Sequence, residues 1–352
     1  MILRSLIKLI TINLSLLLAG ALGVELIFGE WFEDGLASLN VQRNYEIRYS
    51  AKGLYEGAGE IVYKRDPWGF RGDYGNDPAK IDLLTIGGST ANQIYLPDEQ
   101  TWQAVLKREL AAQGKPLTIA SAAIDGQSSI GHLAAFERWF PKVPGLKPKW
   151  VLAYVGLNDI LVKDEQNADR LSHFPSLQHH IRRKSAIYRL IQTVKGVLAA
   201  NQGRMVHRKL DHERAVFTTS PTRQDWPAAR AQALEAYKER IRKLIGQIQA
   251  MGAKAILVTQ RHGDWLIRSD GKVEGIVEEG AATNGVDHHI LMALYNKATL
   301  EVCASEGAIC LDLAGELEFE RNDFYDLVHN TPTGAAKIGR WLALKLKERG
   351  IP

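Results

Sequence analysis

From residue 81 to the C-terminus, short apolar runs alternate with longer segments whose apolar residues recur at helical spacing. The apolar runs cover residues 81–87, 117–123, 149–156, 253–260 and 308–315. Runs of this length and composition are typical of strands buried on both faces of a sheet. Their alternation with amphipathic helices predicts an α/β fold with a central, mostly parallel five-stranded sheet and helices on both sides.

Residues 160–226 interrupt this alternation and are rich in His, Arg and Gln. One moderate helical pattern lies within them, so we interpret them as a mostly helical insertion after the third strand, forming a lid or a partner surface. The basic cluster HHIRRK at 179–184 is either a solvated helix face or a site for an anionic polymer.

Residues 1–30 are far more apolar than the rest, with an uncharged stretch from Leu9 to Val24. With its apolar flanks, this stretch approaches the roughly 20 residues that a membrane-spanning helix needs. Arg4 and Lys8 precede it, so the positive-inside rule places the N-terminus in the cytoplasm. The segment is either an uncleaved transmembrane anchor or a signal peptide with small residues at a cleavage site at 19–21. Both alternatives predict that the remaining chain is exported, to the periplasm in a Gram-negative source.

Residues 31–80 are polar and turn-rich, and they read as a leader between the membrane and the main domain. Two stretches of alternating polarity, 45–51 and 60–65, flank a glycine-containing loop and predict a β-hairpin. The main domain then extends over residues 81–352, including the insertion.

Composition narrows the class of protein further. The chain has 352 residues, 45% of them hydrophobic and 24% charged, which is ordinary for a folded globular protein. The net charge of +4 is small and spread out, so it gives no indication of nucleic-acid binding. Two cysteines are too few for a disulfide scaffold or a four-cysteine zinc site. In an oxidising compartment Cys303 and Cys310 either form one disulfide or remain two separate buried thiols.

Polar residues follow several of the predicted strands, at the edge of the sheet where α/β proteins bind ligands. Ser89 comes after the first strand, Gly126 after the second and Asn158 after the third. An Asp326-Leu-Val-His329 sequence precedes the last helix. Taken singly, each has a simpler interpretation as a turn, a helix cap or a surface residue. Their joint order and position favour a catalytic site.

The combination resembles the SGNH (GDSL-like) hydrolase family over about residues 81–349. GGST, DGQS, GLND and DLVH stand where that family carries its four sequence blocks. One difference is that the Asp usually found before the serine is Gly88 here. The resemblance implies a flavodoxin-like three-layer α/β/α sandwich.

The resemblance also implies roles for individual residues. Ser89 would be the nucleophile, His329 its general base and Asp326 the group that orients the imidazole. The oxyanion hole would consist of the Ser89 and Gly126 backbone N–H groups and the Asn158 side-chain amide. A serine hydroxyl does need a neighbouring base, and histidine suits that role at neutral pH. Such a mechanism requires no metal and no organic cofactor.

The function expected is that of a serine esterase, with O-acetyl groups on an extracytoplasmic polysaccharide as the substrate. Two alternatives remain open: an O-acyltransferase that modifies a cell-surface or secreted glycan, and a non-catalytic glycan-binding protein on the same scaffold. Arg261 and His262 follow the fourth strand and are candidates for lining the substrate pocket. The partners expected are thus an acylated carbohydrate or another ester, and a membrane bound through residues 1–30.

Overall fold

The computed structural model describes the chain except at a limited set of positions. These are residues 1, 30, 33–34, 37–38, 40, 163–168, 170, 172–180, 182–183, 189, 192–206, 208 and 352. The chain divides into two units: residues 1–41 with 174–204 form one, and residues 42–173 with 205–352 form the other. Much of the predicted insertion, including most of the basic cluster at 179–184, therefore lies outside the described residues.

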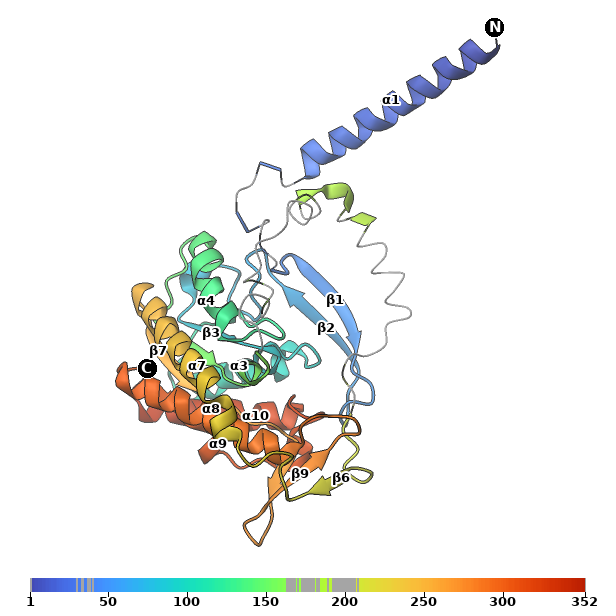
Figure 1. The fold of residues 1–352 in the computed structure, drawn as a ribbon. Helices are drawn as coiled ribbons and strands as arrows, with labels where there is room; N and C mark the ends of the chain where they lie inside the picture. Colours follow the sequence, from blue (N-terminus) through green and yellow to red (C-terminus); the bar gives the residue numbers. More distant parts are fainter. Residues whose placement is uncertain are drawn as a thin grey trace. The chain divides into compact units, whose positions relative to one another are not determined.

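Five parallel strands form the central sheet of the larger unit (Figure 1). They are β3 (Leu83–Gly87), β4 (Ile119–Ser121), β5 (Trp150–Tyr154), β7 (Lys254–Val258) and β10 (Ile309–Leu311), in the order β10-β7-β5-β3-β4. Each strand lies within one of the five apolar runs, so the predicted sheet is confirmed. The strand order reverses between β3 and β5, and in open α/β sheets the crevice at such a reversal is where ligands bind.

The main helices of this unit pack in two groups. One group pairs α3 (Trp102–Ala112) with α10 (Pro332–Glu348). The other places α7 (Trp226–Ala250) against both α4 (Ser129–Arg138) and α8 (Gly285–Ser305). Right-handed crossovers from this strand order put the two groups on opposite faces of the sheet. The three-layer sandwich is thus confirmed. The short helical elements are α2 (Ser89–Asn92), η2 (Pro78–Lys80), η3 (Asp98–Gln100), η4 (Phe140–Lys142), η5 (Asn158–Leu161), α9 (Leu313–Glu316) and η6 (Arg321–Asp323).

Two smaller antiparallel sheets accompany the central one. β1 (Tyr45–Ser50) pairs with β2 (Glu60–Arg65), and the buried side chains of Leu54 and Ile61 join the core around α3 and α10. We predicted from the sequence that residues 31–80 form a leader, whereas the structure groups residues 42–80 with the main domain.

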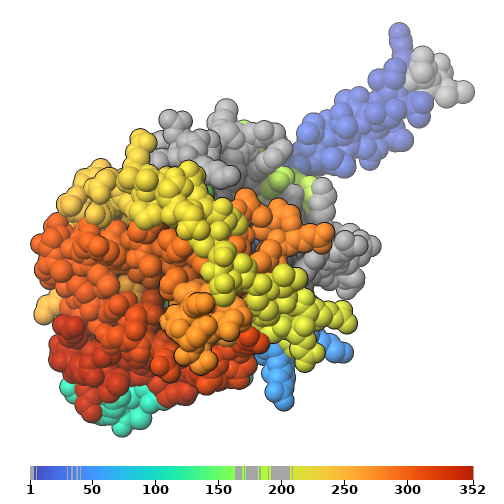
Figure 2. All heavy atoms as spheres, turned by 60° about the horizontal axis from the view of Figure 1, so that its bottom comes forward, coloured from blue at the N-terminus to red at the C-terminus, as the bar shows by residue number. Residues whose placement is uncertain are grey.

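The second small sheet combines β6 (Val216–Thr218), β9 (Val273–Val277) and β8 (Trp265–Ile267). β6 falls in the stretch that was expected to be mostly helical. Its three residues form a strand instead, because they pair with β9 from a distant part of the chain. Figure 2 shows the yellow-green residues of this region beside the orange residues that follow β7.

The smaller unit contains α1 (Ile2–Phe28), the helix formed by the N-terminal apolar segment. Within it, Leu6–Phe28 has a mean hydropathy of 1.9 and is long and apolar enough to cross a membrane. Near its end, the Glu25 carboxylate accepts hydrogen bonds from the Ser185 hydroxyl and from the backbone N–H groups of Ala186 (3.0 Å) and Ile187 (3.1 Å). The Glu25 carboxylate thus accepts hydrogen bonds from N–H groups at the start of a helical segment, where no carbonyl oxygen of that segment can accept them.

A disulfide joins Cys303, in the last turn of α8, to Cys310 in β10. It closes a short loop of the chain and fixes an edge strand of the sheet to the helix that precedes it. Of the two alternatives for Cys303 and Cys310, the structure has the disulfide.

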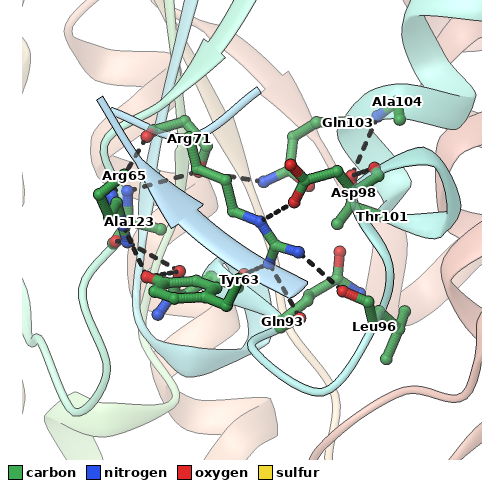
Figure 3. Close-up of polar contacts among 12 residues, drawn as sticks. Tyr63, Arg65, Arg71, Gln93, Leu96, Asp98, Thr101, Gln103, Ala104 and Ala123 are labelled. Atoms are coloured by element: carbon green, nitrogen blue, oxygen red, sulfur yellow. Dashed lines mark hydrogen bonds and ion pairs between the residues drawn. The ribbon is translucent and has the colours of Figure 1, made fainter. Parts of the chain in front are cut away.

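Two buried arginines join the segment around β2 to the loops after β3 and β4 (Figure 3). The Arg65 guanidinium donates hydrogen bonds to the Tyr63 hydroxyl (2.6 Å), to Asn92 Oδ1 (2.7 Å) and to the Ala123 carbonyl oxygen. Tyr63 also donates to Asn92 Oδ1 (2.9 Å). One guanidinium therefore holds two loops at the same edge of the sheet.

Arg71 binds the chain at the end of α2. It donates to the carbonyl oxygens of Asn92, Gln93 (2.9 Å) and Leu96 (2.7 Å), and its Nε donates to Asp98 Oδ1 (2.6 Å). Carbonyl groups at the C-terminus of a helix have no partner within the helix, so Arg71 supplies the missing donors. Its side chain is only 3% exposed, and removing it would leave the buried carbonyl oxygens of Asn92 and Leu96 without this donor.

We expect Arg71→Met to destabilise the protein by about 2–4 kcal/mol, because it leaves the buried carbonyl oxygens of Asn92 and Leu96 without a donor. The measurement is urea unfolding of the full chain in detergent, followed by tryptophan fluorescence. Arg48→Met is the matched control, because the Arg48–Glu60 ion pair is exposed on both sides (65% and 61%). It should cost less than about 1 kcal/mol. Equal effects of the two substitutions would contradict the interpretation.

Candidate active site

Ser89 lies at the point where β3 turns sharply into a helix. β3 ends at Gly87, Gly88 is the N-cap in an extended conformation, and α2 begins at Ser89 itself. The hydroxyl is therefore presented at the carboxyl edge of the sheet, beside the reversal of strand order.

The loop before α10 brings an imidazole to this serine. His329 Nε2 lies 2.8 Å from Ser89 Oγ, although the two residues are 240 positions apart. On the other side of the ring, His329 Nδ1 lies 2.8 Å from Asp326 Oδ2. The structure thus places the three residues predicted from the sequence in one hydrogen-bonded chain: hydroxyl, imidazole, carboxylate.

The Asp326 carboxylate is fixed by its own loop. Its Oδ1 accepts the backbone N–H groups of Val328 (2.9 Å) and His329 (2.7 Å). Burial acts to raise the pKa of Asp326, but the hydrogen bond and charge of His329 and the two backbone N–H groups outweigh it and lower that pKa. An ionised Asp326 accepts the proton of Nδ1, which leaves the Nε2 lone pair directed at the serine hydroxyl.

Asn158 lies across the crevice, at the start of η5. Its Nδ2 donates a hydrogen bond to the Gln127 carbonyl oxygen (2.9 Å). A Cβ atom at Gly88 would lie 2.1 Å from the same nitrogen, so the amide packs directly against the residue before Ser89. The Asn158 amide in this position therefore leaves no room for a side chain at residue 88.

Gly126 lies in the turn after β4, next to Gln127. Its φ of +74° is in the left-handed region, which glycine adopts without strain. Asp125, just before it, accepts a hydrogen bond from the Asn92 side chain (2.7 Å) and so connects this turn to the end of α2. The predicted positions after β3, β4 and β5 are thus brought to one edge of the sheet.

Several supporting residues were not predicted from the sequence. Gln260, after β7, donates to the Thr90 hydroxyl (2.8 Å) and accepts the backbone N–H of Leu157 (2.9 Å). It thereby connects the serine turn to the Asn158 turn. A buried Gln at the end of a strand has no distinctive sequence signal, so only the structure shows this connection.

Asp159 also supports the Asn158 turn. It accepts hydrogen bonds from the backbone and hydroxyl of Ser129, and Arg240 Nη2 lies 3.4 Å from its Oδ1. Burial raises the pKa of Asp159 to about 6, against the opposing effects of the Ser129 hydrogen bonds and the Arg240 charge. These contacts give Asp159 a role in fixing the loop.

Arg261 and His262, the candidates for the substrate pocket, are buried in the packing of their own loop. The Arg261 guanidinium lies 3.8 Å from the centre of the Trp265 ring and donates to the Trp265 carbonyl oxygen. His262 stacks on His288 at 4.6 Å, and its Nδ1 lies 3.5 Å from Asp264. A role in substrate binding stays a prediction.

His207 is a further residue at the site that the sequence did not indicate. Its ring stacks on His329 with 4.2 Å between ring centres, and its Nδ1 lies 2.8 Å from the Tyr325 hydroxyl. It lies in the polar stretch that interrupts the strand–helix alternation, where no pattern assigns a residue to the sheet edge.

Two groups among the described residues have ligand atoms close enough to hold a metal ion, within 4.8 Å of one another. They are His207, Asp326 and His329, and His262, Asp264 and His288. The first shares its atoms with the serine–histidine–aspartate chain. In the second, His288 Nδ1 lies 2.5 Å from Asp264 Oδ2, so these two atoms already bond to each other.

A hydroxyl in contact with a histidine–aspartate pair, at the carboxyl edge of a parallel sheet, defines the class of α/β serine hydrolases. The family model for GDSL-like lipases and acylhydrolases matches residues 85–337, and the chain belongs to this family of ester-hydrolysing enzymes. No curated protein sequence is similar enough to this chain to count as a match.

Solved structures similar in fold are only distantly related. TesA is 16% identical, with a TM-score of 0.43, over 76% of this chain and 98% of its own. The psychrotrophic esterase EstA from Pseudoalteromonas sp. is 12% identical, with a TM-score of 0.42, over 77% of this chain and 100% of its own. The acetylxylan esterase Axe2 from Geobacillus stearothermophilus is 13% identical, with a TM-score of 0.41, over 75% and 93%.

We expect Gly88→Ala to lower the rate of ester hydrolysis at least about tenfold, because the new Cβ must displace the Asn158 amide. The displaced atom ends a flexible side chain, so the midpoint of unfolding should change little. The measurement is hydrolysis of an aryl acetate alongside thermal unfolding. Gly246→Ala is the control, because nothing lies within 4 Å of a Cβ there. An unchanged rate in Gly88→Ala would show that the amide can move without consequence.

Proposed function

We propose that the protein is a serine esterase that removes O-acetyl groups from an extracytoplasmic polysaccharide, with Ser89, His329 and Asp326 as its catalytic residues. The observation that carries the proposal is the hydrogen-bonded chain from Ser89 Oγ through His329 to Asp326. The family to which the chain belongs hydrolyses esters, which agrees with this chemistry.

The first half of the reaction is attack of Ser89 Oγ on the acyl carbonyl carbon. His329 Nε2 takes the hydroxyl proton as the new bond forms, because a serine hydroxyl is a poor nucleophile at neutral pH. The ionised Asp326 then faces the imidazolium and stabilises its charge.

The tetrahedral intermediate carries a negative charge on the former carbonyl oxygen. We assign its stabilisation to the Ser89 and Gly126 backbone N–H groups and to the Asn158 amide. Asn158 Nδ2 carries two hydrogens, and its bond to Gln127 uses one, so the second is left for the substrate. Each such donor contributes roughly 3–4 kcal/mol to lowering the barrier.

The second half releases the products. His329 gives its proton to the departing alcohol oxygen, which leaves an acetyl ester on Ser89. A water molecule then attacks this ester while the same imidazole takes its proton. The imidazole passes that proton to Ser89 Oγ as the bond between the acetyl carbon and Ser89 Oγ breaks, and acetate is freed. One histidine thus acts as base and acid in turn, and the residues are restored.

The substrate class rests on the compartment. α1 is long and apolar enough to cross a membrane, and the Cys303–Cys310 disulfide is typical of proteins that fold in oxidising compartments. Acylated glycans are ester substrates that an exported enzyme meets there.

Mapping with a fluorophosphonate probe tests the mechanism. We expect the full chain in detergent to be modified at Ser89 and to release acetate from an aryl acetate and from an O-acetylated polysaccharide. Ser89→Ala should abolish both, because the attacking oxygen is absent. Ser269→Ala is the control, since this serine is exposed in the turn between β8 and β9.

Three outcomes would decide against the proposal. Modification at another serine would overturn the assignment of the nucleophile. Acetate transfer to an added oligosaccharide in preference to water would show an acyltransferase. A cellular phenotype unaffected by Ser89→Ala would favour a non-catalytic, glycan-binding role.

We further propose that α1 remains in the mature protein as a membrane anchor. Support comes from the length of the apolar part of α1: Leu6–Phe28 has 23 residues, more than the roughly 7–15 typical of the apolar region of a signal peptide. The rest of the chain then lies outside the cytoplasm.

Alkaline carbonate extraction tests the anchor. We expect the intact chain to remain in the membrane pellet, because about 20 apolar residues in the bilayer resist extraction. A chimera whose residues 1–28 are replaced by a cleavable signal peptide should appear in the supernatant. A soluble wild-type chain that has lost its first residues would show cleavage instead.

A further inference from the structure

His207 places a second imidazole face to face with the catalytic one. The ring centres of His207 and His329 are 4.2 Å apart and the rings are inclined by 27°. The His207 Nδ1 lies 3.5 Å from Asp326 Oδ2, the oxygen that also faces His329 Nδ1. The side chains of His207, Asp326 and His329 are only 15%, 17% and 12% exposed, so little water reaches the groups that meet here.

The position of His207 is held by contacts on two sides. Its Nδ1 and the Tyr325 hydroxyl are 2.8 Å apart, and the Tyr95 ring packs against it at 4.8 Å. Three residues further on, the Leu210 backbone N–H donates to the Tyr325 carbonyl oxygen (2.7 Å). His207 and Leu210 are thus both held against the loop that carries Asp326 and His329.

The buried position of His207 favours its neutral form. Burial is the main cause of a lowered pKa of His207, and the neighbouring His329 lowers it further, while Asp326 and Asp125 oppose this. Burial also raises the pKa of Tyr325 well above its usual value, so its hydroxyl keeps its proton and can donate it to Nδ1. The groups facing His207 are His329, Asp326 and Tyr325 on the catalytic loop, Asp125 after β4 and Tyr95 after α2.

We propose that His207 is a positioning residue for the catalytic pair: its neutral ring supports the face of His329 and covers Asp326 while His329 holds the proton taken from Ser89. The inference rests on the proposed function, because it concerns the same serine, histidine and aspartate. A neutral aromatic face attracts the imidazolium that forms when the Ser89 Oγ–H proton moves to His329 Nε2. A protonated His207 would instead repel that imidazolium and oppose the proton transfer.

The test uses the rate of fluorophosphonate labelling of Ser89 in the full chain in detergent, which needs no knowledge of the natural substrate. We expect His207→Ala to lower the maximal labelling rate about tenfold while the half-saturating probe concentration stays within about twofold. His207→Phe should recover most of the rate, because it restores a ring on His329. Lys209→Ala, an exposed neighbour in the same segment, is the control and should label like wild type.

The pH dependence of the Ser89 labelling rate is a second measurement, and a purely structural role of His207 would not change its shape. At its acidic end, wild-type labelling should fall with the square of the proton concentration, because either protonated imidazole stops the reaction. In His207→Phe it should fall with the first power. This comparison carries the test if His207→Ala does not fold.

The outcomes separate the two proposals. A wild-type chain that labels at Ser89, with His207→Ala labelling equally fast or His207→Phe as slow as His207→Ala, overturns the inference alone. A second-power acidic fall in His207→Phe does the same. Absence of Ser89 labelling in the wild type overturns the assignment of the nucleophile, and the role of His207 falls with it.

Discussion

The geometry of the site depends on two buried guanidiniums that lie outside it. Ser89 begins a helix of only four residues, which has too few internal hydrogen bonds to fix its own direction. Arg65 and Arg71 bind the Asn92 side chain and the carbonyl oxygens where this helix ends. Both arginines come from the segment before the first central strand. Ser89 is therefore oriented by a part of the chain that precedes the sheet. This segment is a structural part of the main unit and not only a leader before it.

The other side of the site, which carries Asp326 and His329, is held by hydrogen bonds within a single loop. Asp326 and His329 are three residues apart in one loop, and the carboxylate is held by that loop's own backbone N–H groups. Gln260 and Asp159 then fix the turn of Asn158 through bonds to Thr90, Leu157 and Ser129. Hydrogen bonds within one loop thus fix Asp326 and His329, whereas contacts between distant segments determine where Ser89 and the Asn158 amide lie. Only residues that bond within one loop form a short motif that can be recognised in the sequence.

This difference explains what could be predicted from the sequence. The five strands were predicted because a buried parallel strand is a continuous apolar run, and the D-x-x-H loop because its residues are neighbours. β6 was not predicted, since three residues of mixed polarity become a strand only through pairing with β9. Arg65, Arg71, Gln260 and His207 were not recognised either. A buried polar residue resembles an exposed one in sequence, and only tertiary contacts show that its hydrogen bonds are satisfied inside the protein.

The separation of 240 residues between Ser89 and His329 has a consequence for biosynthesis. A chain exported N-terminus first would deliver Ser89 across the membrane long before the loop that carries Asp326 and His329. Under the proposed mechanism the serine has no base until that loop arrives and the last helix packs, and contacts of such long sequence separation form slowly. A translocating chain is then chemically inert towards the esters it passes. Its reactivity begins only when the whole catalytic unit has reached its compartment.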